Sequence, residues 1–133
     1  MNPSVELGIS FHSSGQEIEM LKVTPIDDQR YRIEENPLFT EMVSFGDIVK
    51  LEQQGNIYFY KETVRKSRLR RYSWLLSQDV ASSEELAAFK NRVADSGGNW
   101  ETIFGGMLII NVPSHIDFDP DVEINNITIS KDR

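Results

Sequence analysis

Apolar and polar residues alternate along most of the first three quarters of the chain, a pattern typical of half-buried β-strands. In the stretch VELGISFH, for example, Val5, Leu7, Ile9 and Phe11 share one face. Further strand-like stretches cover residues 17–26, 30–35, 48–53, 57–64 and 68–76. The segments between them include SSGQ, DDQ and QGN, whose residue types favour turns. Short strands at this spacing predict a small barrel or a strongly bent sheet.

The pattern changes in the segment SSEELAAFKNRVADSGG, which predicts a helix near residues 83–95. Ser82 or Ser83 can cap its N-terminus, where the following two glutamates favour the positive end of the helix dipole. Leu86, Phe89 and Val93 form the apolar face, and the Gly pair at 97–98 ends the helix.

The remaining C-terminal segment predicts a closing β-hairpin. Its strands are residues 100–104 and 107–112, joined by a turn at Gly105-Gly106, and the apolar run MLII indicates burial on both faces of the second strand. The segment HIDFDPDVE is expected to be an acidic loop, and INNITIS (124–130) a last strand or a tail.

These elements predict an α+β fold: a strand-rich antiparallel sheet or small, partly open barrel, one helix near residues 83–95, and a closing β-hairpin. At 133 residues the chain fits one domain of about 100–200 residues, so we expect a single α+β domain over residues 1–133. It has no cysteine, no signal-peptide pattern and no apolar run near the roughly 20 residues of a membrane span. We therefore expect a cytoplasmic protein with no membrane partner.

Charge is distributed unevenly along the sequence. The net charge of −7 argues against non-specific binding of nucleic acid by the whole surface. Residues 61–71 nevertheless carry six basic groups and one acidic group, which leaves −12 for the rest of the chain. The strand that contains much of this run has no clean apolar face, so we expect it at an edge or rim, where charge also discourages unwanted strand pairing.

Three interpretations of this basic run stay open. It is a solvated edge strand, or one half of a charge-complementary protein interface, or a groove for single-stranded nucleic acid in which aromatic side chains stack on bases. The candidate residues are Arg65, Lys66, Arg68, Arg70, Arg71, Tyr72 and Trp74.

Catalytic and metal-binding constellations are weak in this sequence. Asp117, Asp119 and Asp121 have the spacing of calcium ligands, but Val122 and Thr128 stand where an EF-hand loop has Gly and Glu. The two histidines, His12 and His115, define no triad by themselves, and no glycine-rich phosphate loop is present. We therefore predict a protein without enzymatic activity, metal or cofactor.

The motif residues of the first half resemble a small bacterial family of domains of unknown function. The resemblance rests on Asp28, Tyr31, Asn36, Pro37, Phe39, Ser44, Gly46, Asp47, Val49, Val64 and Ser67, and on the closing strand that ends with Val112 and Pro113. The sequence departs from the family at Arg68, where the family tends to have glycine. Since these are turn and core residues, the resemblance implies a fold rather than an activity.

A small acidic domain with segregated charge and no catalytic constellation favours a binding protein. The leading hypothesis is an immunity or antitoxin protein that neutralises a toxin, for example a nuclease, by blocking its active site. Acidic groups would dock on the basic cleft: Asp27, Asp28, Glu34, Glu35, Glu84, Glu85, Asp117, Asp119 and Asp121. The alternative is a single-stranded nucleic-acid-binding module that uses the basic strand 65–71.

Overall fold

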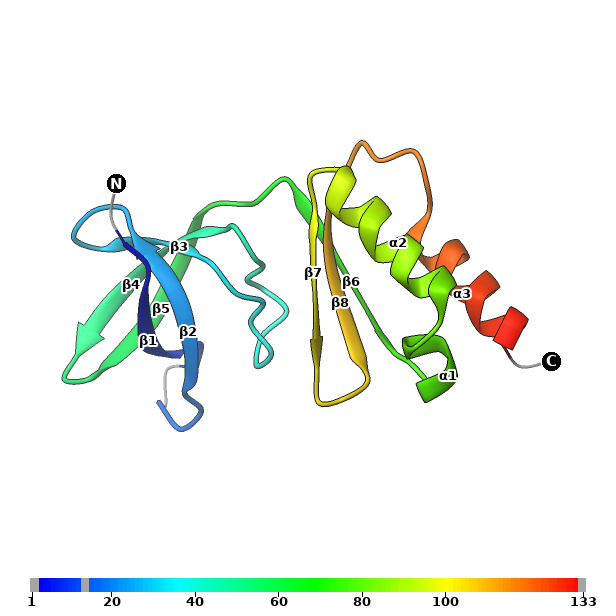
Figure 1. Cartoon of the computed structure of the whole chain (residues 1–133). Helices are drawn as coiled ribbons and strands as arrows, with labels where there is room; N and C mark the ends of the chain where they lie inside the picture. The colour runs from blue at the N-terminus through cyan, green and yellow to red at the C-terminus, as the bar shows by residue number, and fades with distance from the viewer. Residues whose placement is uncertain (1–2, 13–14, 132–133) are drawn as a thin grey trace. The chain divides into compact units, whose positions relative to one another are not determined.

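The computed structural model describes residues 3–12 and 15–131, which form two compact units, Met1–Arg68 and Leu69–Arg133 (Figure 1). Each unit has its own buried apolar cluster. The antiparallel, strand-rich first part, the helix and the closing hairpin confirm the predicted α+β class. The single domain predicted for residues 1–133 stays a prediction, and each unit is described by itself.

The first unit is a closed five-stranded barrel in the order β1-β2-β3-β4-β5. Its strands are β1 (Val5–Ser10), β2 (Glu19–Pro25), β3 (Arg30–Ile33), β4 (Ile48–Gln54) and β5 (Ile57–Arg65). Neighbouring strands pair antiparallel, and the ring closes where β1 pairs with β5 in parallel, with Ile9 opposite Tyr58 and Ser10 opposite Phe59. The barrel is thus closed rather than partly open.

Alternation along the strands fills the barrel interior. In β1 and β2 the inward positions include Ile9, Leu21 and Val23, all of which are buried. The turn expected at SSGQ includes Gly15, whose φ of 69° lies in the left-handed region that glycine adopts without strain. Ser13 and Ser14 of the same segment lie outside the described residues.

The second unit is a three-stranded antiparallel sheet whose core lies beneath its helices. Its strand order is β6-β8-β7, with β6 (Leu69–Leu75) and β7 (Asn99–Ile103) at the edges and β8 (Met107–Pro113) in the centre. Residues 108–112 of β8 are all buried, as the apolar run predicts. Leu108, Ile110 and Val112 pack with apolar residues of the helices in one cluster.

Among residues 69–131, this unit has three helices: α1 (Gln78–Ala81), α2 (Glu84–Asp95) and α3 (Pro120–Lys131). The predicted helix is confirmed as α2, and its N-cap is Ser83, whose hydroxyl accepts a hydrogen bond from the Leu86 amide. Gly97, with φ of 93°, follows the C-cap and lets the chain turn into β7. The short helix α1, capped by Ser77, was not expected from the sequence.

The expectation of a last strand or tail at INNITIS is wrong, because this segment belongs to α3. The Asp119 carboxylate accepts hydrogen bonds from the amides of residues 121 and 122, and Pro120 occupies the first helical position, where its missing N–H costs nothing. Pro120, Ile124 and Ile127 are buried with helical spacing. Burial of this face outweighs the strand preference of the β-branched residues.

Candidate protein-binding surfaces

The basic run does not lie on one strand. Arg65 ends β5, and Lys66 and Arg68 follow it within the first unit, whereas Arg70 and Arg71 lie on β6 of the second unit. β6 is an edge strand of its sheet, as predicted. The run is therefore divided between two units instead of forming a continuous basic strand.

Lys66 holds a buried carboxylate. Its Nζ lies 2.6 Å from Oδ2 of Asp47, whose side chain is 0% exposed, and 3.2 Å from the carbonyl oxygen of Met42. The same carboxylate accepts hydrogen bonds from the Ser44 amide at 2.9 Å and the Ser67 amide at 2.7 Å. Lys66 and Asp47 thus tie the loop before β4 to the segment after β5, which is a structural role.

The two aromatic candidates on β6 belong to the second core. The rings of Tyr72 and Trp74 stack with centroids 6.0 Å apart, and Trp74 meets Phe89 edge to face. The Trp74 indole Nε1 donates a hydrogen bond to Asp121 at 2.9 Å. Because both rings are partly buried against this core, less of their surface is open to a stacked base.

Three cations of the run remain available. Arg65, Arg68 and Arg70 are exposed, and none of their guanidinium groups has an ion-pair partner within the part of the chain that the structure describes. Arg71, in contrast, is half-buried.

The acidic candidates of the barrel unit mostly serve local structure. Asp27 pairs with Arg30, and the side-chain hydrogen bond from Arg30 lowers the pKa of Asp27 below its usual value. Glu35 accepts a hydrogen bond from the backbone amide of Lys22 at 2.8 Å. Asp28 is exposed and has no ion-pair partner among the described residues.

Glu34 is a partly buried carboxylate of this group. Its partial burial opposes ionisation, but hydrogen bonds from Arg32 and the Thr24 hydroxyl outweigh this effect and hold the pKa of Glu34 below its usual value. Glu34 therefore links β2 to the end of β3 as a charged hydrogen-bond acceptor.

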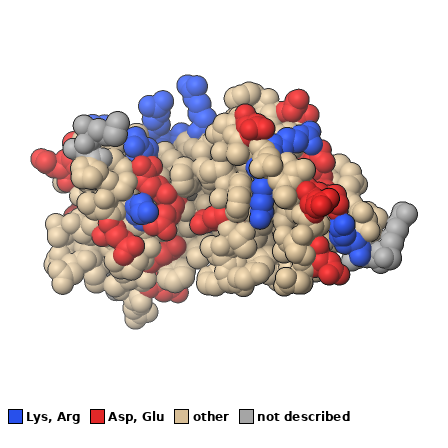
Figure 2. Space-filling model, viewed as in Figure 1, with Lys and Arg blue, Asp and Glu red and all other residues tan. Residues whose placement is uncertain are grey.

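Five acidic candidates lie on the helices of the second unit or on the segment leading to α3. We define the helical layer as residues 78–96 and 114–131, which contain eight acidic and three basic side chains, a net charge of −5. Its acidic residues are Asp79, Glu84, Glu85, Asp95, Asp117, Asp119, Asp121 and Glu123. Figure 2 shows acidic side chains at several points over α2 and α3, with fewer basic ones among them.

Within the helical layer, some carboxylates form hydrogen bonds or ion pairs inside the protein and others do not. Asp119 caps α3, Asp121 accepts from Trp74, and Glu85 pairs with Lys131 at 2.6 Å. Glu84 and Asp117 are exposed and have no ion-pair partner in residues 3–12 and 15–131. These two carboxylates are available to an external partner.

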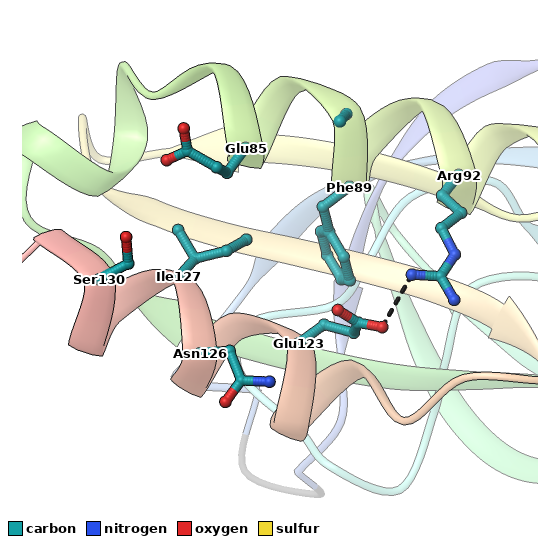
Figure 3. Close-up of a pocket in the computed structure, with 8 residues that line it drawn as sticks. Glu85, Phe89, Arg92, Glu123, Asn126, Ile127 and Ser130 are labelled. Carbon is teal, nitrogen blue, oxygen red and sulfur yellow. Dashed lines mark hydrogen bonds and ion pairs between the residues drawn. The ribbon is translucent and has the colours of Figure 1, made fainter.

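A groove of about 410 Å³ runs between α2 and α3 (Figure 3). One stripe of α2, residues 85, 88, 89 and 92, faces one stripe of α3, residues 123, 126, 127 and 130. Both stripes have the i, i+3, i+4, i+7 spacing of a single helix face. Phe89 and Ile127 are almost fully buried and form the apolar floor.

Ion pairs join the two helices at both ends of the groove. Arg92 Nη1 lies 2.8 Å from Glu123 Oε1, as the dashed line in Figure 3 marks, and Glu85 pairs with Lys131. Since residue 85 pairs with 131 and residue 92 with 123, α2 and α3 are antiparallel. The Arg92 guanidinium also lies 4.3 Å from the Phe118 ring centroid, which fixes this end further.

A strand or tail at residues 124–130 would not form this groove, because its second wall is the helix α3. A signal was present. Glu123, Asn126, Ile127 and Ser130 have helical spacing, and the Asp-Pro pair before them is typical of a helix start.

The histidines and other potential metal ligands do not cluster into a site among the described residues. His12 lies 3.7 Å from a carboxylate oxygen of Glu17, and both side chains are exposed. His115 is exposed in the second unit. Within residues 3–12 and 15–131, no three metal-ligating side chains are grouped to hold an ion, and no helix is both long and apolar enough to cross a membrane.

Comparison with known proteins identifies a family and a fold. Residues 19–124 match the family described as "Domain of unknown function (DUF4265)". A crystal structure of a hypothetical protein from Neisseria gonorrhoeae is similar, with a TM-score of 0.63 and 18% identity, over 99% of this chain and 89% of that chain. At this identity, the similarity shows the fold alone. No curated protein matches the sequence.

Proposed function

We propose a protein-binding role for this chain, which belongs to the DUF4265 family of domains of unknown function. In its concrete form the protein is an immunity protein that neutralises a toxin by covering the toxin's active site. The observation that carries this proposal is the net charge of −5 on the helical layer. The partner accordingly presents a basic surface, as the active-site cleft of a nuclease does.

The arrangement of the acidic groups supports docking by electrostatic attraction. Glu84 lies in the first turn of α2 and Asp117 in the segment before α3, and neither carboxylate is neutralised by an ion pair among the described residues. Complementary charge raises association rates and selects against acidic partners. Fast association suits an inhibitor that must reach its target before the target acts.

A second candidate function is binding of single-stranded nucleic acid through the basic run, and the exposure of Arg65, Arg68 and Arg70 favours it. Two findings weigh against it: the run is divided between the units, and Tyr72 and Trp74 are engaged in the second core. If this function is correct, the protein should bind oligonucleotides with an affinity that falls steeply as the salt concentration rises. Replacing the three arginines by alanine should abolish this binding.

The test is affinity purification of the tagged protein from its native cells, with and without nuclease treatment. The proposal requires one stoichiometric, basic protein partner that survives nuclease treatment. That partner must be toxic when it is expressed alone and harmless when it is co-expressed with this protein. A partner without toxicity would overturn the immunity role, and recovery that depends on nucleic acid would favour the second candidate.

A charge-neutralising double variant tests the surface itself. Replacing Glu84→Gln and Asp117→Asn should slow association with the captured partner about tenfold at low salt. The matched control neutralises two exposed carboxylates of the barrel unit, Glu6→Gln and Glu41→Gln, and should leave the rate unchanged. Equal slowing in both variants would show a general charge effect and would contradict docking on the helical layer.

A further inference from the structure

Two short side chains line the middle of the groove between α2 and α3. Ala88 of α2 and Asn126 of α3 lie between the two terminal ion pairs, above the Phe89 and Ile127 floor. The volume of about 410 Å³ is near the lower end of ligand sites, which span roughly 300–1,000 Å³. It suits one large apolar side chain or two small ones.

The antiparallel helix pair also sets the shape of an occupant. Two parallel ridges with an apolar trough between them match the face of a third helix, whose anchors would recur at the same i, i+3, i+4, i+7 spacing. Phe89 and Ile127 would contact the anchors, and the polar side chains along both edges would remain at the rim, as in known interfaces.

Charge complementarity indicates the charge of the helix that would occupy the groove. The helical layer carries a net charge of −5, although Glu85 and Glu123 at the ends of the groove are each paired with a cation, Lys131 and Arg92. A second copy of this chain would bring the same negative charge to the interface, and like charges placed opposite one another are unfavourable. A helix with lysine or arginine beside its apolar face would instead compensate the net negative charge of the helical layer.

We infer that the α2–α3 groove binds a basic amphipathic helix of the protein partner, with an apolar anchor seated over Phe89 and Ile127. This inference rests on the proposed function, since it specifies how the acidic helical layer recognises its basic partner. It names the groove as the anchor pocket and the surrounding carboxylates as the charge-selecting rim.

A matched pair of tryptophan substitutions tests the groove without removing any contact. Ala88→Trp fills the trough, whereas Ala87→Trp adds the same side chain at the neighbouring exposed position of α2, which does not line the groove. Both variants carry the same small cost in helix propensity. Asn126→Trp and Asn125→Trp repeat this comparison on α3, where both asparagines are exposed and only Asn126 lines the groove.

The probe is a labelled synthetic amphipathic helix of Leu and Lys, about 18 residues or five turns long, titrated by fluorescence anisotropy. Two control peptides separate the contributions: in one, Glu replaces Lys, and in the other, Ala replaces Leu. We expect the Leu/Lys peptide to bind best, and Ala88→Trp and Asn126→Trp to weaken it about tenfold or more. Ala87→Trp and Asn125→Trp should leave its affinity unchanged.

The outcomes distinguish the groove from the acidic layer. Equal binding to wild type and Ala88→Trp, or no binding at all, would overturn the groove as the anchor site. Equal binding of the Leu/Glu peptide would overturn its charge selection. If the groove variants have no effect while Glu84→Gln with Asp117→Asn still slows the native partner, the proposed function stands and only this inference fails.

Discussion

Removal of the Asp47 carboxylate should destabilise the barrel unit strongly. The side chain is fully buried and accepts hydrogen bonds from the amides of Ser44 and Ser67 and from the Lys66 ammonium. In Asp47→Ala both backbone amides lose their acceptor. Each buried unsatisfied group lowers the free energy of unfolding by about 1–3 kcal/mol. Lys66 can rehydrate, because its side chain is 57% exposed. We therefore expect a loss of about 3 kcal/mol in the free energy of unfolding.

The substitution Asp47→Asn refines this prediction. An amide has one acceptor oxygen, so it can satisfy only one of the two backbone amides and presents a donor to the other. Its cost should fall between those of Asp47→Ala and of the control Asp28→Ala, which removes an exposed carboxylate.

The assay must report on the barrel unit itself. Both tryptophans, Trp74 and Trp100, belong to the second unit, so tryptophan fluorescence does not follow the barrel. Hydrogen exchange of the Ile33 amide does, because that amide bonds to the Asp47 carbonyl at 2.8 Å. A loss below about 1 kcal/mol for Asp47→Ala, the size of an ordinary surface effect, would refute the network argument.

Two further predictions concern single positions in each unit. Because the pKa of Glu34 is lowered in the folded protein, its carboxylate stabilises the folded state above the unfolded-state pKa, and this contribution is lost as pH falls through the folded-state pKa. Glu34→Gln should therefore flatten the pH dependence of the free energy of unfolding on the acid side of the unfolded-state pKa. An unchanged slope there would contradict this prediction. In the second unit, Gly98→Ala should lower the free energy of unfolding by about 1–3 kcal/mol, because a Cβ at this position collides with the Asn111 carbonyl. The urea midpoint, followed by tryptophan fluorescence, should fall accordingly. Gly105→Ala, where a Cβ meets no atom within 4 Å, should cost less, about 1 kcal/mol for its φ of 77°.

The strands, α2 and the closing hairpin could be predicted because their signals are local. Alternation predicted that Ile9 and Phe11 share one face, and both are buried; Ser83 and Gly97 marked the ends of α2. Closure of the barrel could not be predicted, since it depends on a parallel β1–β5 pairing between residues that are about 50 positions apart. The helix α3 differs from the strand or tail expected at INNITIS, because Ile124 and Ile127 have the spacing of a buried helical face.

The candidate residues were harder to assign, because a charge pattern does not show which charges the fold uses. Lys66 has the same sequence signal as Arg65 or Arg68, yet it holds the buried carboxylate of Asp47. Trp74, chosen as a base-stacking side chain, packs on Phe89. Long-range pairing decides these roles, so the sequence identified the charged segments but not the side chains that remain available.

The two features proposed for binding should act on different rate constants. The ion pairs of the groove rim, Glu85 with Lys131 and Arg92 with Glu123, are partly exposed, and exposed pairs contribute only about 0–1 kcal/mol. If a partner's lysine replaces Lys131 as the ion-pair partner of Glu85, the binding free energy therefore changes little. This exchange adds little to the lifetime of a complex. The acidic layer should instead speed association, in a salt-dependent way, while an anchor buried over Phe89 should slow dissociation. Stopped-flow measurements should accordingly find that salt mainly changes the association rate and that Ala88→Trp mainly raises the dissociation rate.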